Sequence, residues 1–319
     1  MIDFTEYRQS LRSQETASVE DNIHQLPSTD LSGQANHPSD RLLTLMPPLL
    51  HGFDLQSHEW QPLPVSDIFP VSWEKQPFER LFLPIDSKDD LKSSLDSILQ
   101  QDLDDEEQVL RTRRAFQFTG DPGTGKTMAA EFVAEYAERP LYRVNIARSC
   151  TTTNEVQTEL SKAKYLASSW QCVLLIDNAD SLLELPVTAD MASNASAFAL
   201  SRLMYEFQGI LIITRSRKCG PMRTHVRFPF KFCLQFPEWC WDYQVSFWTY
   251  VLKDNIGVDR IDKDVWRQLP KIVDFGSNGH DIRDIVINAK RLAAQRKCLV
   301  DYDTIYTAQR LLETTIRFV

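Results

Sequence analysis

The chain contains the run Gly120-Asp-Pro-Gly-Thr-Gly-Lys-Thr127, which matches the pattern GxxxxGK[ST] at every fixed position. Glycines let backbone N–H groups curl around phosphate oxygens at the start of a helix, where the helix dipole favours negative charge. The lysine of the pattern reaches the β- and γ-phosphates, and the threonine hydroxyl coordinates Mg²⁺. The residues predicted to bind a nucleotide are Gly120, Asp121, Pro122, Gly123, Thr124, Gly125, Lys126, Thr127 and Met128.

Alternating strands and helices surround this loop. Apolar runs predict strands at residues 115–119, 141–145, 172–176 and 209–214, and helical spacing predicts helices at 128–137, 155–166 and about 193–207. Strands separated by helices of this length run parallel, and a parallel sheet needs helices on both faces. The expected fold is therefore α/β, with a parallel sheet sandwiched by helices.

An acidic residue ends the third of these strands. Asp177 directly follows the buried run Val173-Leu-Leu-Ile176. In proteins with a phosphate loop, an aspartate at this place helps to hold Mg²⁺ together with the loop threonine. We therefore expect Thr127 and Asp177 to form the metal site.

The parts of the chain on either side have different compositions. Residues 1–40 are rich in Ser, Gln, Asp and Glu and have no apolar period, which predicts a disordered tail. Residues 41–72 contain short apolar runs interrupted by prolines, which is typical of short strands and turns. Beyond Pro237 only helical spacing occurs. We expect an α/β domain over 73–239 and a small all-helical domain over 240–319.

Composition excludes several classes of protein. The formal net charge of −9 argues against binding to the nucleic-acid phosphate backbone. No apolar run approaches the roughly 20 residues of a membrane span, and the acidic first residues are unlike a signal or transit peptide. The six cysteines lack zinc-ligand or CxxC spacing, which argues against a zinc site and a redox dithiol. These features predict a cytoplasmic or nuclear protein without a membrane or nucleic-acid partner.

Four segments in order carry a family resemblance. Residues 119–127, Cys172-Val-Leu-Leu-Ile-Asp-Asn-Ala-Asp180, Gly209-Ile-Leu-Ile-Ile-Thr214 and Asn278-Gly-His-Asp-Ile-Arg283 together resemble the AAA+ ATPases. More narrowly, the chain resembles fungal AAA-family proteins with a long uncharacterised N-terminal region, of which residues 41–72 would be a remnant. The resemblance implies ATP and Mg²⁺ held between a P-loop NTPase α/β domain and a helical lid, usually at a subunit interface of a ring.

Two positions depart from the family pattern, one directly after Asp177 and one at the end of the fourth strand. The family has a glutamate directly after this aspartate, where it activates the attacking water, but this chain has Asn178. An amide cannot accept a proton at neutral pH, although it can position a water molecule. Asp180 is the nearest other carboxylate that could substitute for the missing glutamate. The sensor 1 asparagine of the family is replaced by Ser216, whose shorter side chain has one hydroxyl.

The arginine finger is also altered. The resemblance places it just before a strand, where this chain has Phe228-Pro-Phe230. Arg223 or Arg227 could take its place. The alternative is a solvated basic loop that contains both arginines together with Arg215, Arg217 and Lys218. Loss of a finger typically lowers the rate of phosphoryl transfer by about 10³ to 10⁵.

The sensor 2 position is retained. Arg283 stands where the family directs an arginine toward the γ-phosphate, and His280 replaces a nearby arginine; a surface arginine is the alternative. The predicted catalytic set is Asn178, Ser216 and Arg283. Two functions fit this pattern: a weak ATPase that remodels a protein client, or an inactive ATP-binding pseudoenzyme that acts as a regulatory or scaffold subunit.

The remaining expectations concern partners. The chain would bind ATP and ADP, recognise an unidentified protein client through residues 1–72, and assemble into a homo- or hetero-oligomeric ring. A clamp-loader-like nucleic-acid protein is disfavoured by the charge of −9.

Overall fold

The computed structural model describes residues 1–3, 7, 48–74, 77–104, 114–146, 152–183, 191–216, 226–238, 240–273 and 278–316. It divides into two compact units, Met1–Ser72 and Trp73–Val319. Most of the predicted tail, residues 1–40, lies outside the described residues.

The first unit is built on an antiparallel hairpin. Strands β1 (Leu49–Asp54) and β2 (Glu59–Pro64) pair with Phe53 opposite Trp60, and η1 (Val65–Asp67) follows. Met1 lies against β1, because its ammonium group donates to the Phe53 carbonyl at 2.8 Å and its own carbonyl accepts from the Phe53 N–H at 2.7 Å. The Tyr7 ring stacks on His51 with the ring centroids 4.3 Å apart.

The second unit contains a five-stranded parallel sheet. Its order is β4-β5-β6-β3-β7, and every neighbouring pair is parallel. Four of these strands follow the apolar runs of the sequence, and all five residues of β5 are buried. The strands are β3 (Ala115–Gly120), β4 (Leu141–Asn145), β5 (Val173–Asp177), β6 (Leu211–Ser216) and β7 (Phe230–Gln235).

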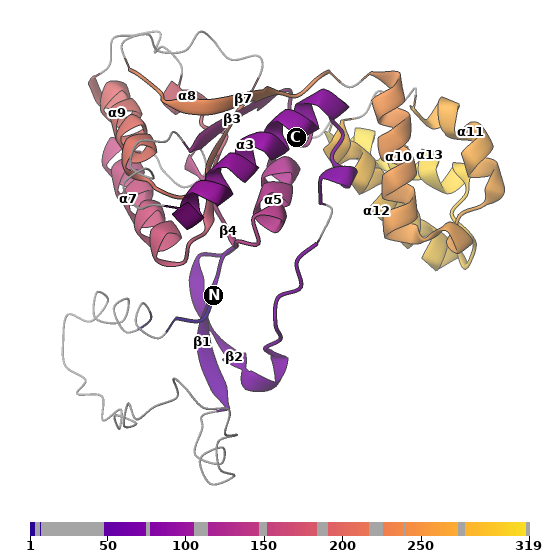
Figure 1. Cartoon of the computed structure of the whole chain (residues 1–319). Helices are drawn as coiled ribbons and strands as arrows, with labels where there is room; N and C mark the ends of the chain where they lie inside the picture. The colour runs from indigo at the N-terminus through magenta and orange to yellow at the C-terminus, as the bar shows by residue number, and fades with distance from the viewer. Residues whose placement is uncertain are drawn as a thin grey trace. The chain divides into compact units, whose positions relative to one another are not determined.

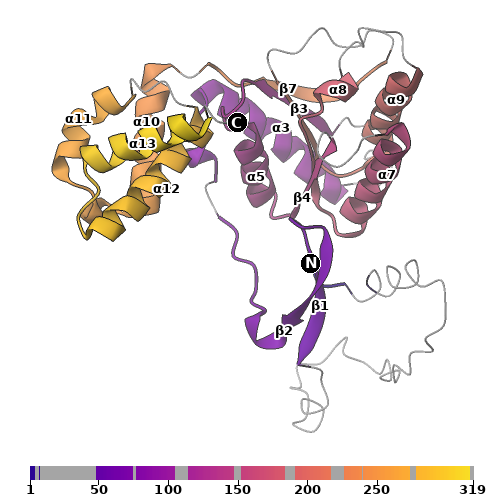
Figure 2. The same cartoon turned by 180° about the vertical axis from the view of Figure 1, so that it is seen from behind.

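Helices cover both faces of this sheet, as Figures 1 and 2 show. On one face, α3 (Ile85–Asp104) and α5 (Lys126–Tyr136) pack on a buried apolar layer that includes Phe116, Leu175 and Ile212. On the other face lie α7 (Thr153–Ser169) and α9 (Met191–Glu206). The short elements are η2 (Pro77–Arg80) and α8 (Asp180–Leu183). The predicted α/β sandwich is confirmed.

The C-terminal part is helical and has its own apolar core. Its elements are α10 (Trp241–Ile256), η3 (Val258–Arg260), α11 (Lys263–Val273), α12 (Gly279–Arg296) and α13 (Tyr302–Ile316). Trp248 is fully buried at the centre, surrounded by the apolar faces of these helices. Phe82, which precedes α3, packs against this core with its ring centroid 5.2 Å from that of Phe247. The predicted helical domain after the sheet is confirmed.

Among the described residues, none of the helices has both the length and the apolar character that a bilayer crossing requires.

Candidate nucleotide site

The loop from 120 to 125 joins the end of β3 to the start of α5, and its backbone requires glycine. Gly123 and Gly125 have φ angles of +78° and +96°, a region that side chains disfavour. A Cβ on Gly120 would lie 2.7 Å from the Cβ of Phe236. The loop therefore takes a tight path, with its backbone close to the first turn of α5, as phosphate binding requires.

The Lys126 side chain lies inside this loop. Its ammonium group donates to the carbonyl oxygens of Gly120 and Asp121, both at 2.8 Å, and the residue is buried. The Thr124 hydroxyl donates to the same Asp121 carbonyl at 2.8 Å. These bonds hold a buried positive charge at the N-terminus of α5, where an anion is favoured.

The carboxylate of Asp177 lies beside Thr127 at the end of β5. The Thr127 Oγ1 is 3.4 Å from Asp177 Oδ1 and 3.3 Å from Oδ2. The Thr214 hydroxyl donates to Oδ1 at 2.5 Å, and the Arg143 guanidinium forms an ion pair with Oδ2 at 2.6 Å. Asp177 is only 3% exposed, so four polar side chains meet at a buried carboxylate.

This arrangement fits a magnesium ion and a phosphate chain. Mg²⁺ prefers oxygen ligands and usually binds through one or two carboxylates, waters and substrate phosphates. Thr127 and Asp177 supply a hydroxyl and a carboxylate within 3.4 Å of each other. A Cβ would clash at Gly120 and Gly123, at 2.7 and 2.9 Å from neighbouring atoms, and the positive φ of Gly125 disfavours a side chain there.

The residue after Asp177 has an unusual backbone. Asn178 has φ +55°, in the left-handed region that asparagine adopts more readily than most residues. Its N–H donates to the Thr214 hydroxyl at 2.9 Å. The side chain at this position is an amide that lines the cleft, where the family pattern has a carboxylate.

The spare carboxylate nearby points to another partner. Asp180 begins α8, and its Oδ1 accepts a hydrogen bond from the Ser216 N–H at 2.8 Å. The interaction joins the start of α8 to the end of β6. Neither Asp180 nor Ser216 is among the described residues that line the cleft.

The helical domain supplies the opposite wall. The Arg283 guanidinium lies 3.0 Å from the Met128 sulfur and over the Phe247 ring, 5.9 Å from its centroid. Asn278 caps α12 by accepting from the N–H groups of residues 280 and 281, and a Cβ on Gly123 would lie 2.9 Å from it. The start of α12 thus packs directly on the phosphate loop.

Together these groups enclose a cleft of about 400 Å³. Desolvation raises the pKa of the Glu131 carboxyl on its wall, while Arg283 and Arg143 oppose this shift. The residues that line the cleft are Leu81, Phe82, Pro122, Gly123, Thr124, Gly125, Lys126, Thr127, Met128, Glu131, Arg143, Asp177, Asn178, Phe247, Gly279, His280 and Arg283.

Most of the residues expected from the sequence meet here. Residues 122–128, Asp177, Asn178 and Arg283 line the cleft together, whereas Gly120, Asp121 and Ser216 are not among its lining residues. Sequence reasoning missed Arg143 and Thr214, both of which bond to Asp177. The sequence feature that could have indicated Arg143 is a charged residue in the middle of a predicted strand, between Tyr142 and Val144.

One expectation about the basic loop is wrong. Arg215 was expected in solvent, but it is only 9% exposed, because β6 continues through it and pairs it with Thr119 of β3. Arg227 has an exposed side chain. The other three basic positions, Arg217, Lys218 and Arg223, lie outside the described residues.

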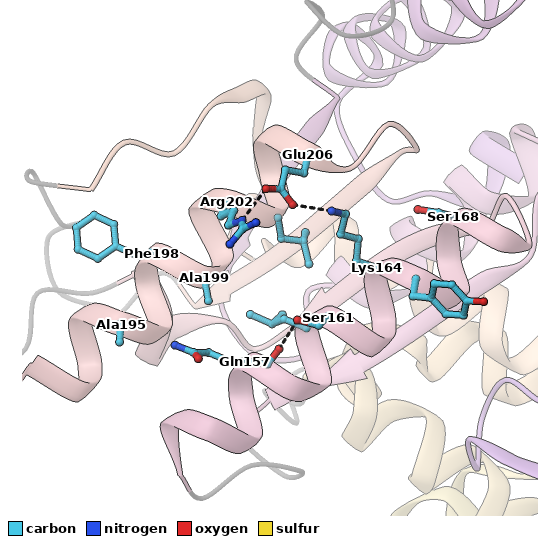
Figure 3. A pocket seen from close by; sticks show the side chains of 12 residues that line it. Gln157, Ser161, Lys164, Ser168, Ala195, Phe198, Ala199, Arg202 and Glu206 are labelled. Carbon is cyan, nitrogen blue, oxygen red and sulfur yellow. Dashed lines mark hydrogen bonds and ion pairs between the residues drawn. The ribbon is translucent and has the colours of Figure 1, made fainter. Parts of the chain in front are cut away.

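A larger groove of about 840 Å³ runs between α7 and α9 and shares no lining residue with the cleft. Figure 3 shows that Lys164 and Arg202 both point toward Glu206, each ion pair being 2.6 Å long. The basic groups of this groove are thus already engaged with a carboxylate. It lacks the glycine loop and paired oxygen ligands of the cleft.

Comparisons with known proteins agree with this geometry. The sequence model described as "ATPase family associated with various cellular activities (AAA)" matches residues 116–227. An uncharacterized AAA family ATPase, y4kL of Sinorhizobium fredii (strain NBRC 101917 / NGR234), is 36% identical over 74 residues. That match spans 23% of this chain and only 22% of the relative.

Two solved structures share the fold. The FIGL-1 AAA domain in complex with ADP superposes with a TM-score of 0.56 at 15% identity, covering 88% of this chain and 92% of that one. The FIGL-1 AAA domain without a stated ligand gives 0.54 at 16% identity, covering 75% and 85%. The family model, the curated relative and the shared fold lead to one conclusion: residues 116–227 are similar in sequence to the AAA ATPase family, and the chain has the fold of an AAA domain.

Proposed function

We propose that this chain binds Mg·ATP in the cleft between its sheet and its helical domain. The observation that carries this proposal is the buried Lys126 ammonium inside the glycine loop, with Thr127 within 3.4 Å of Asp177. The loop backbone and Lys126 would hold the phosphates, and Thr127 and Asp177 would hold Mg²⁺. Bound Mg²⁺ would neutralise charge on the phosphates. The FIGL-1 domain in complex with ADP is a precedent from the same fold.

Arg283 would act as the phosphate sensor of the helical domain. Its guanidinium lies beside Met128 on the first turn of α5 and lines the same cleft as the phosphate loop. A bound nucleotide would then contact both domains at once. This would tie the position of the helical domain to the nucleotide that is bound.

Hydrolysis by this site would be slow. Asn178 can orient a water molecule but cannot take its proton. The Asp180 carboxylate accepts from the backbone N–H of Ser216 at the end of β6, and neither residue lines the cleft. The groups that bind nucleotide are thus present, and the groups that activate water are altered.

We propose that the nucleotide cycle remodels a protein client, within a homo- or hetero-oligomeric ring. The second candidate is a pseudoenzyme, in which ATP acts as a structural ligand of a regulatory or scaffold subunit. The altered group at position 178 favours this second reading. A ligand that binds only the folded state stabilises it without turnover.

The two functions are separated by measuring thermal unfolding and phosphate release on the same sample. Unfolding is followed with Mg·ATP, Mg·ADP or a non-hydrolysable ATP analogue, and Lys126→Ala is the control. A raised midpoint with slow turnover supports the ATPase. A raised midpoint without phosphate release supports the pseudoenzyme, and no shift with any nucleotide refutes both.

A further inference from the structure

Arg143 is placed by the sheet register, close to the residue proposed to hold the metal. In the parallel pairing of β4 and β5, Arg143 lies opposite Leu175 and Asn145 lies opposite Asp177. Side chains two residues apart on a strand share a face of the sheet. Arg143 and Asp177 are therefore diagonal neighbours on the face that α5 covers.

The resulting ion pair is short and asymmetric in burial. Arg143 Nη2 is 2.6 Å from Asp177 Oδ2, and the two side chains are 48% and 4% exposed. Since Thr214 donates to Oδ1, the guanidinium occupies the oxygen that is otherwise left for a metal. A half-exposed arginine at the edge strand has room to move, whereas the buried carboxylate does not.

The charges of the cleft support a role for this arginine toward phosphate. Lys126, Arg143 and Arg283 line the cleft, against the carboxylates of Glu131 and Asp177. A guanidinium binds both carboxylate and phosphate oxygens through its planar set of N–H donors. When a cation replaces the guanidinium at Asp177, the released Arg143 would have two kinds of acceptor along the cleft, the Glu131 carboxylate and the phosphates of a bound nucleotide.

We propose that Arg143 is a nucleotide-positioning residue that competes with Mg²⁺ for Asp177 and itself compensates phosphate charge. The inference rests on the proposed nucleotide binding and deepens it. Its consequence is a site whose affinity for nucleotide depends weakly on Mg²⁺, because part of the metal's charge is supplied by the chain.

The test compares affinities with and without the metal. The dissociation constant of a fluorescent, non-hydrolysable ATP analogue is measured in Mg²⁺ and in EDTA, for the wild type and for Arg143→Gln. Without Arg143, metal-free nucleotide should bind more weakly, while Mg·nucleotide should bind equally or more tightly. We expect the EDTA-to-Mg²⁺ ratio of the two constants to rise at least about tenfold in the variant, given the usual strength of charge-assisted hydrogen bonds.

Three further variants sharpen the test. Arg143→Lys keeps the charge and should keep a ratio near that of the wild type. Arg143→Met must give the same ratio as Arg143→Gln, which guards against a folding defect in either variant. Arg202→Gln removes an exposed arginine from a 2.6 Å ion pair in the groove between α7 and α9, and it should leave the ratio unchanged.

The outcomes distinguish this inference from the function on which it rests. If Arg143 only ties β4 to β5, its variants lower the melting temperature of the free protein but keep the EDTA-to-Mg²⁺ ratio of dissociation constants within twofold of the wild-type ratio. This result would overturn the inference and leave the proposed function standing. If the wild type binds no analogue in either buffer, the proposed function fails as well.

Discussion

Asn178→Glu is the substitution that most directly tests why hydrolysis should be slow. It restores a carboxylate at a position that lines the cleft, next to Asp177. A correctly placed general base typically contributes 10² to 10⁴ in rate. We expect phosphate release to rise by about 10²-fold, the lower end of that range, because the arginine finger motif is also altered.

The same substitution has a cost that the backbone sets. Position 178 has φ +55°, where a residue other than glycine or asparagine loses about 1 kcal/mol. For a domain of this size, that loss lowers the melting temperature by about 2 to 4 °C. The backbone hydrogen bond to Thr214 does not involve the side chain and should persist.

Asn178→Gln is the matched control for this experiment. It imposes the same strain without a carboxylate, so it should lose the same stability and gain no activity. Phosphate release is measured under saturating Mg·ATP, with Lys126→Ala as the blank. If Asn178→Glu is no faster than Asn178→Gln, the missing carboxylate does not limit the rate.

Three other outcomes follow from the described contacts. Lys126→Ala should weaken ATP binding about 10- to 140-fold by calorimetry, since a charge-assisted hydrogen bond contributes about 1.5–3 kcal/mol; unchanged affinity would contradict the site. Gly120→Ala should lose about 1–3 kcal/mol in denaturant unfolding, because the new Cβ would lie 2.7 Å from Phe236, and wild-type stability would refute this. Desolvation and the hydrogen bond to Asp96 raise the pKa of Tyr136 to about 12, so the folded state keeps the phenol proton to a higher pH than the unfolded state does. The free energy of unfolding should therefore fall between pH 10 and 12, and it should fall less steeply in Tyr136→Phe.

The sequence predicted the phosphate loop and the strands around it with small errors at their ends. The strand expected at residues 209–214 occupies Leu211–Ser216, and the helix expected at about 193–207 occupies Met191–Glu206. Such boundaries depend on where hydrogen bonding ends, which apolar periodicity does not define. The narrower resemblance to fungal members of the family remains a prediction.

The basic loop shows where a local pattern fails. Arg215 follows an apolar strand and precedes Ser216 and further basic residues, so its composition is that of an exposed loop. The strand continues through it to Ser216, and Arg215 pairs with Thr119 of β3. Burial of a strand end depends on the length of its partners, which lie far away in the sequence.

The sequence by itself determined the fold class, the glycine loop and the acid at the end of β5, because each of these depends on residues close together in the chain. Only the tertiary structure decided that Arg143 pairs with Asp177, that Asp180 caps the end of β6, and that Arg283 reaches Met128. These contacts join residues separated by between 34 and 155 positions. They arise from strand register and from the packing of the helical domain on the loop, neither of which is encoded in any short segment of the sequence.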